Sequence, residues 1–360
     1  MTTLIVPACG KSSRFGEGRP KPYRTHPLGE PMLIEAMKGI TGFDRLVIGV
    51  IAEHITTYGV DLDALKLTIG KHHGITPEFV MLNQSAGSQP GDCYQIIKSA
   101  NITGAICIKD CDNYFKHHIA PNKNFVCISR LKGDTNAINK SYVSLDKNGK
   151  LLGIVEKMVI GDLFCCGGYG FQDADEFCSV YEKVLAIGSI NSGELYISHI
   201  IQDMLLNGSD FDVEDANDYV DWGDNEVWRR YCSQYKTMFV DIDGCLCVNG
   251  SEYFEPKWET SDGLTNNIAL VNEMFDSGTV QVILTTSRKS EYKEATKQQL
   301  TRLGIKYHSI IYDLFHAQRM IVNDFSEGNP YPSAVAFSVD RNADCLRQYI
   351  DIGFRRYNDQ

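Results

Sequence analysis

The chain has 360 residues, a formal net charge of −11 and twelve cysteines. This length accommodates two ordinary domains, and an acidic surface disfavours a nucleic-acid partner. No apolar run reaches the roughly 18 residues that a membrane span needs, and no basic segment followed by an apolar one opens the chain. The cysteines lie mostly in apolar runs and form no C-x-x-C pair. We therefore expect no membrane partner and no zinc ribbon, and a cytoplasmic protein with buried free thiols.

Short apolar runs alternate with helical patterns through the first part of the chain. Strand candidates are 3–6, 46–51, 79–82, 105–108 and 125–128, and helical patterns lie near 31–40 and 92–100. This alternation predicts an α/β domain with a largely parallel sheet. Because ligands of such sheets bind beyond the carboxyl ends of the strands, we expect the site in the loops that follow them.

The segment 6–23, V-P-A-C-G-K-S-S-R-F-G-E-G-R-P-K-P-Y, follows the first of these strands. Its small residues allow backbone N–H groups to turn toward an anion, and Arg14 and Lys21 add positive charge. The pattern predicts a triphosphate-binding loop in which Arg14 and Lys21 are catalytic, and a basic surface loop is the alternative. Further candidates for nucleotide binding in this loop are Ala8, Gly10, Ser12 and Ser13.

Two acids, Asp110 and Asp112, follow the strand 105–108. Buried carboxylates need a cation or strong donors, and Mg²⁺ takes oxygen ligands while keeping phosphate oxygens in its shell. The pair therefore predicts a Mg²⁺ site, with an Asx-turn or a helix cap as the alternative.

The order of these features resembles the nucleotidyltransferases that make nucleotide-sugars. The residues that match the family's loop are Gly10, Ser13, Arg14, Phe15, Pro20 and Lys21, and Ser12 stands where a second Gly is usual. The resemblance implies that Asp110, ahead of Asp112, holds Mg²⁺. It also implies that the polar loop after 79–82 recognises the base, with Gly87 allowing close approach and Gln84 or Ser88 supplying hydrogen bonds.

Three later segments continue this resemblance in the family's order. Glu156 and Lys157 match the pair that meets the sugar hydroxyls and the acceptor phosphate, although Met158 replaces the usual Pro. Glu194 lies in a segment that meets the sugar, and Asp221 matches the second metal-binding carboxylate. The resemblance covers about 1–235. It implies Mg²⁺-dependent transfer from an NTP to a phosphorylated sugar or polyol, and it names neither the base nor the acceptor.

A new pattern starts at residue 236, where a strand at 237–240 leads into D-I-D-G. The alternation of a strand places Asp241 and Asp243 on one face, which suits a carboxylate nucleophile and a general acid/base that share Mg²⁺. The motif resembles that of the haloacid dehalogenase superfamily.

Two further matches to this superfamily follow. A strand at 282–288 ends in hydroxyls, of which Thr286 and Ser287 match the phosphate-holding motif, and a strand at 320–324 ends in Asp324, which matches a metal ligand. The superfamily's lysine has no clear counterpart. Arg319 or a lysine at 293–297 is the candidate in its place.

The expected architecture is α/β, with two Rossmann-like domains. They are a nucleotidyltransferase domain with a mixed, GT-A-like sheet at 1–235 and a capless haloacid dehalogenase-like domain at 236–360. One hypothesis is a bifunctional enzyme that combines nucleotidyl transfer with phosphomonoester hydrolysis and supplies capsule or another surface glycan. The alternative is a nucleotidyltransferase, including a cytidylyltransferase for a non-sugar phosphate, whose second domain is inactive and helps a homo-oligomer form. A nucleotide-sensing module without catalysis leaves both pairs of acids unexplained.

Overall fold

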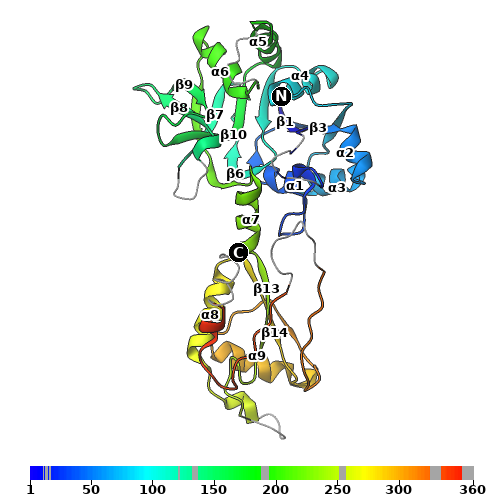
Figure 1. Cartoon of the computed structure of the whole chain (residues 1–360), viewed down its shortest axis with the longest axis vertical. Coiled ribbons are helices and arrows are strands. Elements are labelled where there is room, and N and C mark those ends of the chain that lie inside the picture. The colour runs from blue at the N-terminus through cyan, green and yellow to red at the C-terminus, as the bar shows by residue number, and fades with distance from the viewer. Residues whose placement is uncertain are drawn as a thin grey trace. The chain divides into compact units, whose positions relative to one another are not determined.

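The structure, a computed structural model, describes residues 1–10, 12, 15, 18–120, 122–131, 137–187, 194–250, 257–324 and 334–350. The chain divides into two compact units, Met1–Arg229 and Arg230–Gln360. Each unit contains a sheet and a hydrophobic core of its own (Figure 1).

Four parallel strands form one side of the large sheet in the first unit. In spatial order they are β5 (Ala105–Lys109), β1 (Thr2–Ala8), β3 (Arg45–Ile51) and β4 (Glu78–Leu82). β1 and β5 are buried along their whole length, as expected of strands that are covered on both faces. The predicted strands in these four places are confirmed.

The other side of the sheet is antiparallel around β10 (Leu163–Phe171), which runs between β5 and β7 (Phe125–Arg130). β10 also pairs with β8 (Ser141–Leu145), whose hairpin partner is β9 (Leu151–Glu156), and β11 (Asp212–Asp215) pairs with β7. The sheet is therefore mixed, and the expectation of a largely parallel sheet holds only for its other half. A small separate sheet contains β12 (Asn217–Asp221), β6 (Asn113–His118) and β2 (Ile40–Thr41).

Helices cover both faces of the large sheet (Figure 1). Alternate residues of β1 point to opposite cores: Ile5 packs in one and Leu4 in the other. Ile5 lies with α4 (Gln89–Ser99), α5 (Ala174–Ile187) and α6 (Ile197–Leu206). The core around Leu4 contains residues of α1 (Met32–Met37) and α3 (Leu62–His73), with α2 (Ala52–Thr57) packed beside it. Short 3₁₀ turns lie at η2 (Lys21–Tyr23) and η3 (Ala137–Asn139).

The second unit has a three-stranded parallel sheet in the order β13 (Lys236–Asp241), β14 (Val280–Thr285), β15 (Ser309–Ile311). Among its described residues, helices include α8 (Thr265–Asp276), α9 (Lys293–Arg302) and a helical stretch at 346–350, with 3₁₀ turns at η4 (Lys257–Thr260) and η5 (Ser290–Tyr292). α7 (Asn225–Gln234) contains the boundary between the units.

The predicted strand at 320–324 is not formed. The segment has no regular secondary structure, and Met320 and Val322 are each 85% exposed. An apolar run this short persists as a strand only when a neighbouring strand pairs with it, and no described strand does so.

All twelve cysteines are free thiols, and eight of them are buried as predicted, while the other four are half-buried. None of the helices in the described ranges is long and apolar enough to cross a membrane.

Candidate functional site

The turn 110–113 follows β5 at its carboxyl end, and the side chain of Lys109 is hydrogen-bonded to it. This lysine is fully buried. Its Nζ donates to the backbone oxygens of Asp110 (2.7 Å) and Asn113 (3.0 Å), and to Asn113 Oδ1 (2.6 Å). It also lies 4.6 Å from the centre of the Phe115 ring. A buried ammonium needs such partners in place of water, so Lys109 fixes the turn that presents the two acids.

Asp112 is paired with the predicted catalytic lysine. Lys21 Nζ donates to Asp112 Oδ2 at 2.7 Å and to the backbone oxygen of Gly223 at 2.7 Å, and Lys21 is only 8% exposed. Burial opposes ionisation of Asp112, but Lys21, with smaller contributions from Lys140 and Lys109, lowers the pKa of this carboxyl below its usual range. Asp112 is therefore a carboxylate at neutral pH.

Asp221 reaches the same place from β12. It lies opposite Asn113 in the pairing of β12 with β6, and the next backbone N–H, of Trp222, donates to the Asp112 backbone oxygen at 2.9 Å. A Cβ on Gly223 would lie 3.0 Å from Asp221 Oδ1 and 3.8 Å from Asp112 Oδ2. The two carboxylates therefore flank one backbone position.

A second lysine, Lys140, is paired with Asp221. Its Nζ donates to Asp221 Oδ2 and, at 2.9 Å, to the hydroxyl of Tyr219. The side chains of Lys140 and Asp221 are 12% and 15% exposed. Sequence reasoning missed Lys140 because nothing before the strand 141–145 distinguishes this lysine from a solvated one.

Asp110 has different surroundings. Gln89 Nε2 donates to Asp110 Oδ1, and a Cβ on Gly167 would lie 2.4 Å from Asp110 Oδ2. Burial, and then the charge of Asp112, raises the pKa of Asp110 above its usual range. The structure thus groups Asp221 with Asp112, whereas the family resemblance had placed Asp110 first.

The donor set beside Gly223 fits Mg²⁺, which takes carboxylate oxygens and completes its shell with water and phosphate oxygens. Within the described ranges, no three His, Cys, Asp or Glu side chains are arranged to hold a metal ion. Asp112 and Asp221 would therefore hold the ion together with oxygens from outside the protein.

The N-terminal loop follows β1 at Ala8, and Gly10 is exposed. Ser12 has φ of +54°, so it adopts the left-handed conformation that a Gly takes without strain. Its Oγ accepts from the backbone N–H of Lys21 at 2.9 Å, which compensates for the strain and positions Lys21. Ser13 and Arg14 lie outside the described residues.

The loop after β4 is organised by an acid that sequence reasoning missed. Asp92 is buried and accepts from Ser85 Oγ and, at 2.7 Å, from the Ala86 backbone N–H. An acid in the first turn of the helix that follows is the signal that would have identified it. Among the predicted residues, Ser88 caps α4 by accepting from the Gly91 N–H, while Gln84 and Gly87 are exposed.

The predicted acceptor residues form two neighbouring clusters. Glu156 Oε2 accepts from Ser141 Oγ and, at 2.8 Å, from Ser198 Oγ. Lys157 Nζ donates to the Tyr196 hydroxyl, which donates to Glu194.

The backbone connects these clusters to the carboxylates, because the Lys157 N–H donates to the Lys140 oxygen at 2.9 Å. Residues 191–193, the beginning of the segment 191–198 that resembles the family's sugar-contacting segment, lie outside the described residues.

In the second unit a buried arginine is bound to Asp243. Arg288 Nε and one terminal nitrogen donate to the two oxygens of Asp243 at 2.9 and 2.7 Å, and Thr286 Oγ1 lies 3.4 Å from Asp243 Oδ2. The guanidinium stacks on Trp258 at 3.9 Å from the ring centre. Sequence reasoning missed Arg288 although it directly follows Ser287, because nothing in the sequence distinguishes an arginine there from one on the surface.

Asp241 is the more open of the two acids. Burial, and then the charge of Asp243, raises the pKa of Asp241 to about 6. A terminal nitrogen of Arg319 lies 3.9 Å from Asp241 Oδ1 and 3.3 Å from Ser287 Oγ. Asp324 is exposed in the irregular segment that replaces the predicted strand.

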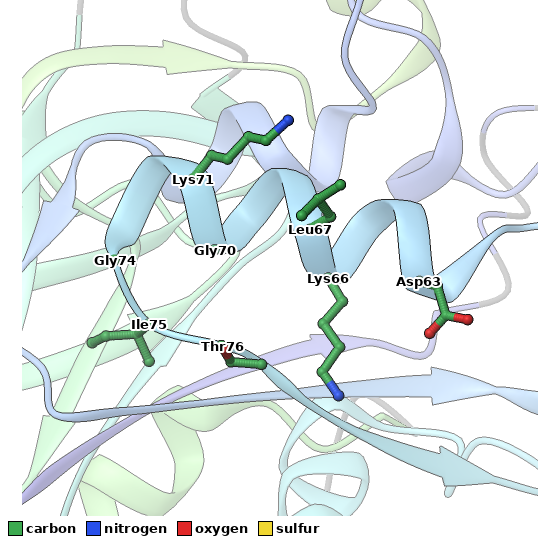
Figure 2. A pocket seen from close by; sticks show the side chains of 8 residues that line it. All are labelled: Asp63, Lys66, Leu67, Gly70, Lys71, Gly74, Ile75 and Thr76. Atoms are coloured by element: carbon green, nitrogen blue, oxygen red, sulfur yellow. The ribbon is translucent and has the colours of Figure 1, made fainter.

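A surface pocket lies along α3, and none of the residues predicted for the site lines it. Figure 2 shows that the ammonium groups of Lys66 and Lys71 point away from each other, so they do not form a common anion site. The pocket is lined by Asp63, Lys66, Leu67, Gly70, Lys71, Gly74, Ile75 and Thr76.

No protein-family model matches the chain, and no curated protein matches its sequence. Solved structures do match. A nucleoside-diphosphate-sugar pyrophosphorylase from Vibrio cholerae RC9 has a TM-score of 0.53 at 16% identity, over 64% of this chain and 99% of that one. A UDP-glucose pyrophosphorylase complexed with UDP-glucose has a TM-score of 0.49 at 13% identity, over 65% and 97%. The first likeness shows a shared fold, and the mixed sheet agrees with it.

Proposed function

We propose that the unit Met1–Arg229 is a nucleotidyltransferase that joins a nucleotidyl group from an NTP to a phosphorylated sugar or polyol and releases pyrophosphate. The observation that carries this proposal is the convergence of Asp112, Asp221 and Lys21 at the carboxyl end of the parallel strands. Ligands of such sheets bind at this edge. The shared fold with a nucleoside-diphosphate-sugar pyrophosphorylase supports the reaction class.

In the proposed reaction an oxygen of the acceptor phosphate attacks the α-phosphorus in line. The new P–O bond forms as the bond to pyrophosphate breaks, so catalysis consists mainly of positioning and charge neutralisation. Arg14 and Lys21 hold the triphosphate, Lys157 holds the acceptor phosphate, and Glu156 and Glu194 accept from the sugar hydroxyls. Mg²⁺ held by Asp112 and Asp221 would neutralise charge on the phosphates.

The test is pyrophosphate release by the full chain, with each of the four NTPs against a panel of sugar phosphates, polyol phosphates and non-sugar phosphomonoesters. One productive pair would name the base and the acceptor, and would decide whether the product suits a surface glycan such as capsule. No release from any pair would contradict the proposal.

The two proposed phosphate sites predict different kinetic effects. Lys157→Ala is expected to raise KM for the acceptor about tenfold or more, because it removes one charge-assisted contact, and to leave KM for the NTP nearly unchanged. Steady-state kinetics with each substrate varied in turn provide the measurement. If only KM for the NTP rises, Lys157 belongs to the triphosphate instead.

For the second unit we propose a phosphomonoesterase, because Asp241, Ser287 and Arg319 converge at the carboxyl ends of β13 and β14. Asp241 would attack phosphorus, and Asp243 would protonate the leaving alkoxide as its bond to phosphorus breaks. Water would then hydrolyse the phosphoryl group from Asp241 and release phosphate, with Thr286 or Ser287 holding the phosphate oxygens. Mg²⁺ held by Asp241, Asp243 and Asp324 would neutralise the phosphate. In the structure Asp324 lies in the irregular segment 320–324, so it would join the other two acids only in another arrangement of that segment.

Phosphate release from sugar monophosphates and bisphosphates is expected to disappear in Asp241→Asn, because the nucleophile is lost. Measuring both proteins in an Asp112→Asn background excludes any phosphate release that depends on the site in the first unit. The alternative, a structural domain in a homo-oligomer, is favoured by the Arg288 pair, since a leaving group would compete with Arg288 for Asp243. If the wild type releases no phosphate from any of these substrates, that alternative stands.

A further inference from the structure

Both carboxylates proposed for the metal are paired with lysines. We propose that Lys21 occupies the metal's place at Asp112, and that metal and triphosphate bind together because the triphosphate draws Lys21 away. The inference rests on the proposed function and adds to it a coupling between two ligands.

Lys21 is held closely where it lies. Its ammonium has two acceptors, Asp112 Oδ2 and the Gly223 oxygen, each at 2.7 Å, and lies 4.7 Å from the centre of the Phe15 ring. With 8% of the residue exposed, little water screens its charge. A divalent cation bound to the same oxygen would lie within a few ångströms of the ammonium, and like charges this close repel strongly away from water. Metal and ammonium therefore compete for Asp112.

A metal ion alone has little to offset that competition. Asp221 is likewise paired, with Lys140, and both of those side chains are mostly buried. Across the described part of the chain no third acid, His or Cys completes a metal site. The remaining ligands must be water or phosphate oxygens.

A triphosphate would weaken the competition for Asp112 and would also supply the missing metal ligands. Lys21 belongs to the loop proposed to bind it, so phosphate oxygens offer its ammonium an alternative partner. Once Lys21 turns to the phosphates, Asp112 is free for the metal, to which the same phosphates contribute oxygens. Each ligand then raises the affinity for the other by the same factor.

The decisive measurement is binding of Mn²⁺, a paramagnetic substitute for Mg²⁺, to the full chain without nucleotide, with free Mn²⁺ followed by electron paramagnetic resonance. Lys21→Met and Lys21→Gln are expected to bind Mn²⁺ at least about tenfold more tightly than the wild type, a change of about 1.4 kcal/mol. Adding Asp112→Asn to either variant should abolish the gain.

The control is Lys183→Met, which removes a lysine from the Asp203 carboxylate on the surface, where Lys183 Nζ lies 2.9 Å from both oxygens. Its Mn²⁺ affinity should equal that of the wild type. Thermal melts of all variants separate loss of binding from loss of fold.

Unchanged or weaker Mn²⁺ binding by both folded Lys21 variants would overturn the inference. That result leaves the proposed function intact if the wild type still releases pyrophosphate. Conversely, a gain in Mn²⁺ affinity that depends on Asp112, in a protein that uses no NTP, would support the competition at Asp112 and refute the transferase.

Discussion

Asp112→Asn is expected to lower the rate of pyrophosphate release about 10³-fold, since it removes a charge that holds the metal against the phosphates. Asp221→Asn should have a similar effect, because Asp221 flanks the same position at Gly223. Neither change alters side-chain volume much, so both proteins should fold. The measurement is a coupled pyrophosphate assay with saturating substrates, together with Mn²⁺ binding in the presence of the NTP.

Asp110→Asn provides the comparison within the same turn. Its carboxylate accepts from Gln89 and faces Gly167, whereas Asp112 and Asp221 flank Gly223, so the loss of activity should be smaller than in Asp112→Asn. If Asp110→Asn is inactive while Asp112→Asn retains near-full activity, the assignment that the family resemblance implied is the right one, and the grouping of Asp112 with Asp221 has no catalytic meaning.

Gly167→Ala is expected to destabilise the first unit by about 3 to 5 kcal/mol, through backbone strain added to overpacking. Gly167 has φ of +87°, and its new Cβ would lie 2.4 Å from Asp110 Oδ2 and 2.7 Å from Asn113 Nδ2. The carboxylate turn would have to move, so activity should fall as well. Urea unfolding in a Trp258→Phe background leaves Trp222 and Trp228 to report on the first unit.

Gly149→Ala is the matched control. Gly149 also has positive φ, +80°, but a Cβ there meets nothing within 4 Å. Its cost is expected to be only the backbone strain, about 1 to 2 kcal/mol, with activity unchanged. Equal destabilisation by the two substitutions would show that contact with the carboxylate turn contributes nothing.

The elements that sequence predicted well are those whose pattern is local. The expected strands 3–6 and 105–108 lie over the apolar runs 4–9 and 105–108, and apolar runs of four or more residues bounded by turn residues are typical of buried strands. The run at 320–322 is equally apolar but three residues long, and it remained exposed. Whether this run forms a strand depends on pairing with a strand that is distant in the sequence, and the local composition does not predict such pairing.

Within the candidate site, sequence located the acids but not their partners. Three charged residues look like ordinary surface residues in the sequence: Lys109, Lys140 and Arg288. Only their tertiary contacts show that they bind the acids of the site. The choice between Asp110 and Asp112 stays a prediction, because both acids follow one strand and only the approach of β12 distinguishes them.

The buried thiols allow the two units to be compared without any assay of activity. Cys107 and Cys127 lie in the core of the first unit and Cys247 in that of the second. Burial raises the pKa of Cys107 to about 12 and that of Cys247 to about 11, so these thiols react with an alkylating reagent only when the surrounding structure opens. Residue-resolved alkylation rates, read by mass spectrometry, would thus report the local opening free energy of each unit in the same sample.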